Sequence, residues 1–136
     1  MNFQSTVNVV LIAPEIPQNT GNIIRLCANV GARLHLVKPL GFHLGNPGLR
    51  RASLDYTDLT NIIVYNSTEE LFEAVSIDRT YGATIPGSVL YTTPKYQLGD
   101  TIVFGPESVG LSSDVLDELD FEDCIHIPMM PANRSL

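Results

Sequence analysis

Short apolar segments rich in β-branched residues recur along almost the whole chain, and Pro or Gly follows several of them. Segments of this kind are typical of buried β-strands. The pattern predicts six strands, at residues 7–13, 34–37, 62–65, 80–85, 101–104 and 124–127. The first, with the sequence V-N-V-V-L-I-A, is expected to be buried on both faces of the sheet.

Apolar residues at helical spacing lie between these strands. Thr20 is expected to be the N-cap of a helix that stops at Gly31. Ser67 followed by Glu70 predicts a capping box for a helix that runs to about residue 75. Further helical segments are expected at residues 49–54 and from Ser112 or Ser113 to about residue 119.

Strands that alternate with helices predict an open α/β domain with a mostly parallel sheet and helices on both faces. The length of 136 residues corresponds to about one domain, so residues 1–136 are expected to form a single one. No apolar run approaches the ~20 residues of a membrane span, and no basic stretch precedes an apolar one as in a signal peptide. Cys27 and Cys124 are too far apart for a CxxC pair, which favours a reducing, cytoplasmic setting.

The formal net charge of −7 changes the expectation for partners, because an acidic protein repels nucleic acid. RNA binding would therefore need a local basic patch or a partner subunit. The positive charges are unevenly spread, and five of the eight Lys and Arg residues lie in the first 51 residues. The acidic stretch at residues 114–123 is interpreted as a solvated helix face and turn.

Four segments that follow predicted strands carry unusual residues, and ligands of open α/β sheets bind beyond the carboxyl ends of strands. These segments are 14–25, 83–87, 104–111 and 127–136. The phosphate-binding patterns GxGxxG and GxxxxGK[ST] do not occur, and neither does the nucleophile elbow GxSxG. The three His residues lack the spacing of a zinc site, so no metal is expected.

Three ordered motifs lie in these segments: N-T-G-N-I-I-R at 19–25, F-G-P-E with G-L at 104–111, and I-P-M with N-R-S-L at 127–136. They resemble the motifs of the SpoU branch of the SPOUT RNA 2′-O-methyltransferases. The resemblance covers essentially the whole chain and is closest to the minimal members that methylate the wobble ribose of tRNA. Those members also carry P-E-I-P-x-N-T-G-N-I-I-R-L-C-A-N and L-R-R-A-x-L-D-Y, found here at 14–29 and 49–56.

The resemblance implies a homodimer with a C-terminal trefoil knot that binds S-adenosylmethionine, without metal, membrane or DNA. Its substrate would be the ribose 2′-hydroxyl of nucleotide 34 of tRNA, a cytidine or a modified uridine. The family pattern continues beyond Leu136 into a helix that threads the knot. The chain is therefore expected to be C-terminally truncated and to lack that last helix.

The resemblance also assigns roles to residues of this sequence. Arg25 is the expected catalytic residue, supported by Asn19 and Asn22. Since a guanidinium stays protonated, Arg25 either gives a proton to a substrate phosphate first or stabilises the developing alkoxide electrostatically, which we prefer. The expected cofactor-binding residues are Ala83, Gly105, Glu107, Ile127, Met129 and Ser135.

Glu107 is expected to hold its loop through backbone amides or to pair with Arg25, and not to act as the base. Three residues are expected either to contact RNA phosphates or to be merely solvated charges: Arg50, Arg51 and Arg134. A noncatalytic module that binds S-adenosylmethionine or RNA is the main alternative function. A flavodoxin-like small-molecule enzyme is a third reading, but no loop of the sequence supports it.

Overall fold

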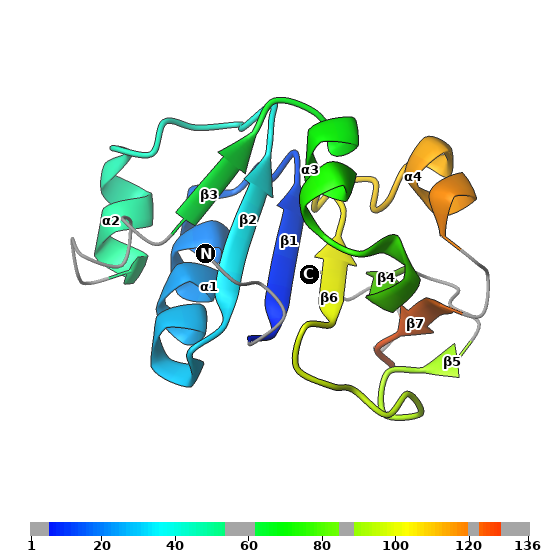
Figure 1. Cartoon of the computed structure of the whole chain (residues 1–136). Coiled ribbons are helices and arrows are strands. Elements are labelled where there is room, and N and C mark those ends of the chain that lie inside the picture. The colour runs from blue at the N-terminus through cyan, green and yellow to red at the C-terminus, as the bar shows by residue number, and fades with distance from the viewer. Residues whose placement is uncertain (1–5, 54–61, 85–88, 120–122, 129–136) are drawn as a thin grey trace.

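The computed structural model describes residues 6–53, 62–84, 89–119 and 123–128. Within these residues the strands are β1 (Asn8–Ile12), β2 (Arg33–Val37), β3 (Ile62–Tyr65), β4 (Thr80–Ala83), β5 (Val89–Leu90), β6 (Thr101–Phe104) and β7 (Cys124–His126). They form one sheet in the order β3-β2-β1-β6-β4-β7-β5, and every pairing in it is parallel (Figure 1). The expected open, mostly parallel sheet is therefore confirmed.

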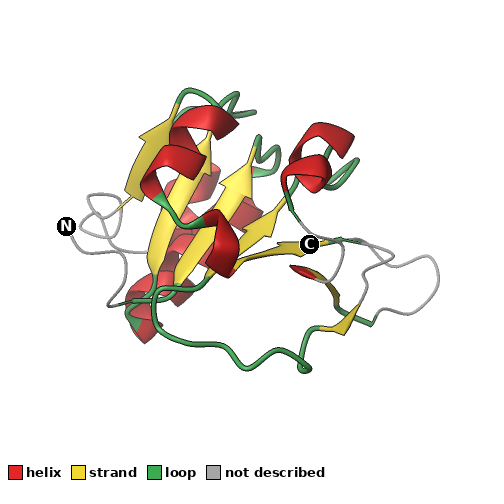
Figure 2. Cartoon of the chain, turned by 45° about the vertical axis from the view of Figure 1, so that its right-hand side comes forward, coloured by secondary structure: helices red, strands yellow, loops and turns green. Residues whose placement is uncertain are grey.

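Helices cover both faces of this sheet (Figure 2). They are α1 (Pro17–Val30), α2 (Pro47–Ser53), α3 (Thr68–Ala74) and α4 (Ser113–Glu118), with the short 3₁₀ helix η3 (Ile77–Arg79) before β4. One apolar cluster joins α1 and α2 to the strands, through Ile24, Cys27 and Leu49. A second cluster on the opposite face joins α3 and α4 to the strands. Among the described residues, no helix is both long enough and apolar enough to cross a membrane.

The start of α1 differs from the expectation. Its N-cap is Ile16, Pro17 occupies the first turn, and Thr20 lies buried inside the helix rather than at its cap. Proline is favoured at this position because its missing N–H is not needed there. The helix ends as predicted, at Gly31, whose φ of 75° is the left-handed conformation that glycine adopts without strain.

Two shorter helices begin where side-chain capping predicts. The Glu70 amide donates to Ser67 Oγ at 3.2 Å, and the Glu70 carboxylate accepts from the Asn66 amide at 2.9 Å. Ser112 Oγ likewise accepts from the Val115 amide at the start of α4. These caps satisfy helix amides that would otherwise lack partners.

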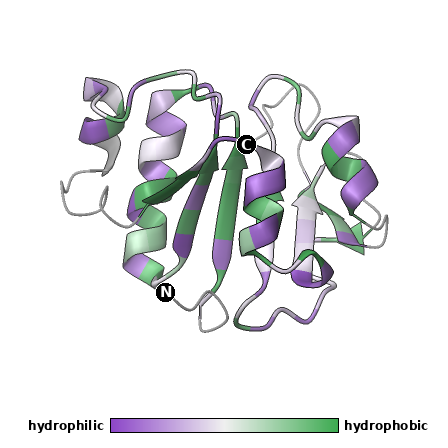
Figure 3. Cartoon of the chain, turned by 45° about the horizontal axis from the view of Figure 1, so that its top comes forward, coloured by the Kyte–Doolittle hydropathy of each residue, from purple (hydrophilic) through white to green (hydrophobic). Residues whose placement is uncertain are grey.

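The central strands consist mostly of hydrophobic residues (Figure 3). Val10 is fully buried, whereas Val9, Leu11 and Ile12 are only half-buried. The prediction that the first strand is buried on both faces is therefore wrong for the described residues. Val9 and Leu11 pack against the cluster of α1 and α2, and Ile12 packs against the cluster of α3 and α4, but each stays partly exposed.

One further difference concerns the second half of the sheet. The strand β5 lies in a segment predicted to be irregular, and at two residues it is too short to leave a periodic signal. The knot expected from the resemblance involves residues 129–136, which lie outside the described residues, so it stays a prediction.

Candidate active site at the switch point of the sheet

The strands β1 and β6 are neighbours, with Leu11 opposite Phe104, but the chain leaves them toward opposite faces. After β1 it enters α1, which packs with α2 on one face, and after β6 it reaches α4 on the other face. A crevice opens where neighbouring strands send their connections to opposite faces, and ligands of open α/β sheets bind there. The fold therefore places a ligand site between the loops that follow β1 and β6.

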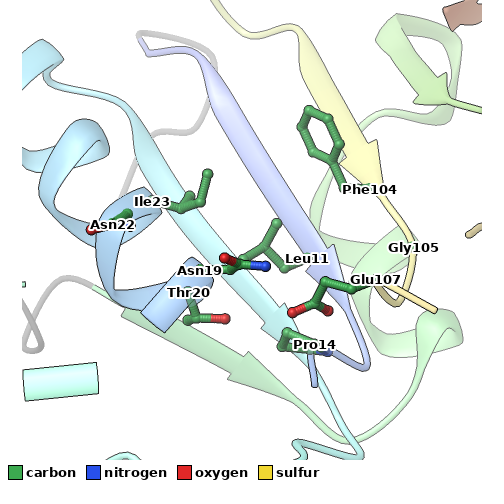
Figure 4. Close-up of a pocket in the computed structure, with 9 residues that line it drawn as sticks. All are labelled: Leu11, Pro14, Asn19, Thr20, Asn22, Ile23, Phe104, Gly105 and Glu107. Carbon is green, nitrogen blue, oxygen red and sulfur yellow. The ribbon is translucent and has the colours of Figure 1, made fainter. Parts of the chain in front are cut away.

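A cavity of about 150 Å³ lies at this point (Figure 4). Its walls are mostly apolar, with a few polar side chains from α1 and from the loop after β6. The lining residues are Leu11, Pro14, Asn19, Thr20, Asn22, Ile23, Phe104, Gly105 and Glu107. Two of the predicted motif segments, 19–25 and 104–111, thus meet at one cavity although about 80 residues separate them.

Two carboxylates tie these segments together in a reciprocal clamp. Glu107 accepts hydrogen bonds from the backbone amides of Glu15 at 2.9 Å and Ile16 at 2.7 Å. Glu15 in turn accepts from the Ser108 amide at 2.8 Å and the Ser108 hydroxyl at 2.7 Å. The hydrogen bonds from the Ser108 amide and hydroxyl lower the pKa of Glu15 below its usual value.

The clamp also explains why Ile16 suffices as the N-cap of α1. Its side chain has no oxygen to accept a hydrogen bond, and the first turn of α1 contains no acidic residue. Glu107 supplies the missing carboxylate from another part of the chain, where the positive end of the helix dipole favours it. Glu107 was expected either to hold its loop through backbone amides or to pair with Arg25, and the structure shows the bonds to backbone amides. No ion pair with Arg25 occurs among the described residues.

The backbone at both loops is tightly constrained. Ala13, directly after β1, has a φ of 47°, a left-handed conformation that is uncommon for residues other than glycine. A Cβ on Gly105 would lie 2.2 Å from the carbonyl carbon of Gly110, so the loop closes on its own backbone at this glycine. Gly105 is thus required for the fold of the loop itself.

The expected catalytic residues lie on α1. Asn19 and Asn22 line the cavity, and Asn19 lies close to Glu107 in Figure 4. Arg25 is exposed and comes one turn after Asn22 on the same side of the helix, outside the residues that line the cavity. The structure thus brings the two Asn residues to the site and leaves Arg25 on the adjoining surface.

Three of the expected cofactor-binding residues lie in one row. Ala83 ends β4, whose neighbours are β6 and β7, and Gly105 and Ile127 directly follow those two strands. This row of backbone at the carboxyl edge is the place where an open α/β sheet binds a ligand. Beside it, Nδ1 of His126 is buried without a hydrogen-bond partner among the described residues. The row therefore fits a ligand held through backbone and ring nitrogen groups.

Other expected site residues are only partly placed. Arg50 and Arg51 are exposed on α2. Met129, Arg134 and Ser135 lie outside the described residues, so their assignments stay predictions. The described part of the chain contains no group of three or more His, Cys, Asp or Glu side chains that could hold a metal ion.

Three residues of this site were not predicted from the sequence. Glu15 and Ser108 form half of the clamp, but the sequence gives no sign that they meet. Thr20, which is 1% exposed, has a hydroxyl without a hydrogen-bond partner among the described residues, and it points into the cavity in Figure 4. Thr20 could have been recognised from the sequence, because it is a polar residue at a helix position that faces the sheet.

The sheet and its switch-point site define an open α/β protein with a ligand site at the carboxyl edge. Over residues 6–136 the chain matches the model of the SpoU rRNA Methylase family, and it belongs to that family. It is 50% identical over 129 residues to a tRNA (cytidine(34)-2'-O)-methyltransferase of Methylovorus glucosotrophus, covering 95% of this chain and 84% of the relative.

Solved structures agree with this assignment. One, from a study of the 2-OH methylation of C/U34 on tRNA, is 38% identical, with a TM-score of 0.86 over 97% of this chain and 86% of that one. An AdoMet-bound rRNA methyltransferase of Sinorhizobium meliloti is 23% identical, with a TM-score of 0.81 over 98% of this chain and 51% of that one. At that identity the second comparison shows the shared fold.

Proposed function

We propose that this chain transfers a methyl group from S-adenosylmethionine to the ribose 2′-hydroxyl of the wobble nucleotide, position 34, of tRNA. The relative that is 50% identical is named for this reaction on cytidine 34, and the structure that is 38% identical comes from a study of C/U34. The target in this chain is therefore a cytidine or a uridine at that position.

One structural observation carries the proposal. The carboxylates of Glu107 and Glu15 join the loop after β6 to the first turn of α1, so that both motif segments border the same cavity. Methyl transfer needs donor and acceptor in line, and positioning by a rigid site contributes several kcal/mol, on the order of 7, to such reactions. The reciprocal clamp, in which two carboxylates accept four hydrogen bonds, provides that rigidity.

The donor would be held by the row of backbone formed by Ala83, Gly105 and Ile127. When bound, S-adenosylmethionine supplies the methyl group on a positively charged sulfur. The chain itself supplies the shape: Gly105 closes the loop after β6, and Glu107 fixes that loop against α1.

We assign Arg25 the role of stabilising, by its positive charge, the alkoxide that forms during the reaction. The acceptor oxygen becomes an alkoxide as it loses its proton, and a guanidinium close to it stabilises that charge. The guanidinium is exposed on α1 beside the cavity, where a ribose entering from solution would meet it. A lysine at this position retains the positive charge, so Arg25→Lys is expected to keep measurable activity.

We further propose that the chain acts as a homodimer in the cytoplasm. On α1, Leu26 is 56% exposed and Val30, one turn later, is 68% exposed. Two large apolar side chains at this spacing form a stripe that a second copy of the helix would bury. Replacing Leu26 with Glu should shift the particle mass measured by light scattering toward that of a monomer.

The proposed compartment rests on the cysteines. The two cysteines are buried and form no disulfide, which accords with a reducing compartment.

Methyl transfer to tRNA is the direct test of the function. Wild type, Arg25→Ala and Arg25→Lys would be incubated with tRNA and labelled S-adenosylmethionine. We expect transfer by the wild type, reduced transfer by the Lys variant, and at least about a hundredfold loss in the Ala variant. A noncatalytic binding module would show no transfer with any of the three, while still binding the cofactor or the RNA.

A further inference from the structure

Charge is strongly segregated along this acidic chain. Residues 16–54 contain five of the eight Lys and Arg residues and none of the fifteen Asp and Glu residues. The rest of the chain therefore carries the entire negative charge and only three positive side chains. A protein with a net charge of −7 thus has one segment that favours polyanions.

Four of these cations belong to α1, to α2 or to the position directly after β2. Arg25 lies on α1, Lys38 directly follows β2, and Arg50 and Arg51 lie on α2, and all four are exposed. The helices α1 and α2 pack against each other through Ile24, Cys27 and Leu49, on the side of the sheet away from α3 and α4 (Figure 1). We call the exposed residues Arg25, Lys38, Arg50 and Arg51 together the basic face. The fifth cation, Arg33, starts β2 at the other edge of the sheet.

A hollow of about 730 Å³ lies along the loop of residues 38–46 and includes Lys38 of the basic face. This volume falls within the ~300–1,000 Å³ typical of ligand pockets. Lys38 and His43 are exposed at its wall, and Phe42 is half-buried there, with its ring packed against the α1 cluster. Asn46 also lines it, but its side-chain oxygen already accepts from the Gly48 amide at 2.8 Å. Lys38, Phe42 and His43 are thus the groups that remain to meet a ligand.

The hollow adjoins the candidate active site. The Gly41 amide donates to the Pro14 carbonyl at 2.9 Å, and a Cβ on Gly41 would lie 3.0 Å from the backbone of Glu15. Pro14 lines the cavity at the switch point, and Glu15 belongs to the clamp. The carboxylate of Glu15 is held by the amide and hydroxyl of Ser108. A chain of nucleotides at the cavity would therefore continue over the hollow.

We propose that this hollow binds single-stranded RNA next to the nucleotide that is methylated, with Phe42 stacking on a base and Lys38 contacting a phosphate. Single-stranded RNA is recognised by aromatic stacking combined with basic side chains, and both are present here at one site. An apolar ring near a lysine suits a base with its phosphate better than it suits a purely acidic peptide. This inference rests on the proposed function, because it places the RNA by the position of the cavity.

The test measures RNA binding separately from catalysis. A fluorescent anticodon stem-loop RNA would be titrated with wild type, Lys38→Gln, Phe42→Leu and the matched control Lys95→Gln, without cofactor and at several salt concentrations. Lys95 is exposed outside the basic face, so its replacement removes the same charge elsewhere. Urea unfolding of each variant establishes that it is folded.

We expect Phe42→Leu to weaken binding about tenfold, since stacking of one base contributes ~1–3 kcal/mol. Lys38→Gln should weaken binding about threefold or more and reduce the slope of log K against log salt by ~0.7. In methyl transfer, both variants should raise KM for tRNA and keep kcat, whereas Lys95→Gln should match the wild type.

The inference is overturned if folded Lys38→Gln and Phe42→Leu bind the stem-loop as Lys95→Gln does. It is also overturned if a fluorescent polyglutamate peptide binds the wild type and the unlabelled stem-loop does not displace it. The surface would then belong to an acidic protein partner. A wild type that binds the stem-loop through Lys38 and Phe42 but transfers no methyl group would contradict the proposed function and support the RNA surface.

Discussion

A buried histidine makes the stability of this fold depend on pH. His35 in β2 is completely buried, with Nδ1 2.9 Å from Tyr65 Oη and Nε2 2.9 Å from Asn8 Oδ1. The Asn8 oxygen can only accept, so Nε2 carries the proton and Nδ1 accepts from the tyrosine hydroxyl. The neutral ring is therefore fully hydrogen-bonded, and a second proton would have to displace the bond from Tyr65.

Burial, and secondarily the positive charge of Arg33, lowers the pKa of His35 from its usual value near 6.5 to about 4. In the unfolded chain the ring takes up a proton near pH 6.5, whereas in the folded protein it stays neutral to about pH 4. The stabilising contribution is therefore complete above about pH 6.5 and is lost as the pH falls toward 4. The full shift corresponds to about 3 kcal/mol, of which about 2 kcal/mol is lost by pH 5.

The assay is urea unfolding of the wild type and His35→Gln at several pH values between 7.5 and 5. Carboxylates also titrate near the lower limit, but they are common to both proteins and cancel in the comparison. We expect the wild type to lose about 2 kcal/mol more than His35→Gln over this range. His43→Gln, which changes an exposed loop residue, should follow the wild type. Parallel curves for the wild type and His35→Gln would refute the reasoning.

Three further predictions follow from single contacts. Arg79→Met should lower the free energy of unfolding by about 2 kcal/mol in thermal or urea unfolding, because it leaves Asp100, 2% exposed, without the guanidinium that it binds at 2.7 Å. Gly105→Ala should abolish methyl transfer while Gly45→Ala does not, because a Cβ collides with backbone at Gly105 and meets nothing within 4 Å at Gly45. Glu107→Gln should lower kcat about tenfold or more, since one side of the clamp loses its charge, and equal rates would contradict the clamp's role.

Local signals were sufficient to predict most elements of the fold. The caps at Ser67 and Ser112 and the stop at Gly31 involve residues within a few positions of one another, so the sequence shows them directly. The parallel sheet followed from the alternation of strands and helices. The predicted start of α1 was wrong because the carboxylate that accepts from the Ile16 amide belongs to Glu107, which lies 91 residues away in the sequence.

The site was predictable only in part for the same reason. The exits of β1, β4, β6 and β7 were each recognised as candidate segments, but periodicity does not say that these strands are neighbours in the sheet. The clamp between Glu15 and Ser108 joins residues 93 positions apart and has no local signature. The motifs marked the segments that matter, and the strand order determined how they meet.

The central claim is methylation of the ribose at one nucleotide of tRNA, and mass spectrometry of nuclease fragments tests it most directly. Unmodified tRNA would be incubated with the wild type and S-adenosylmethionine, and the fragments that contain position 34 would be compared before and after. The account predicts a gain of one methyl group on the ribose of nucleotide 34, absent without the cofactor. A methyl group on a base or at another position, or a folded protein that transfers none, would contradict it.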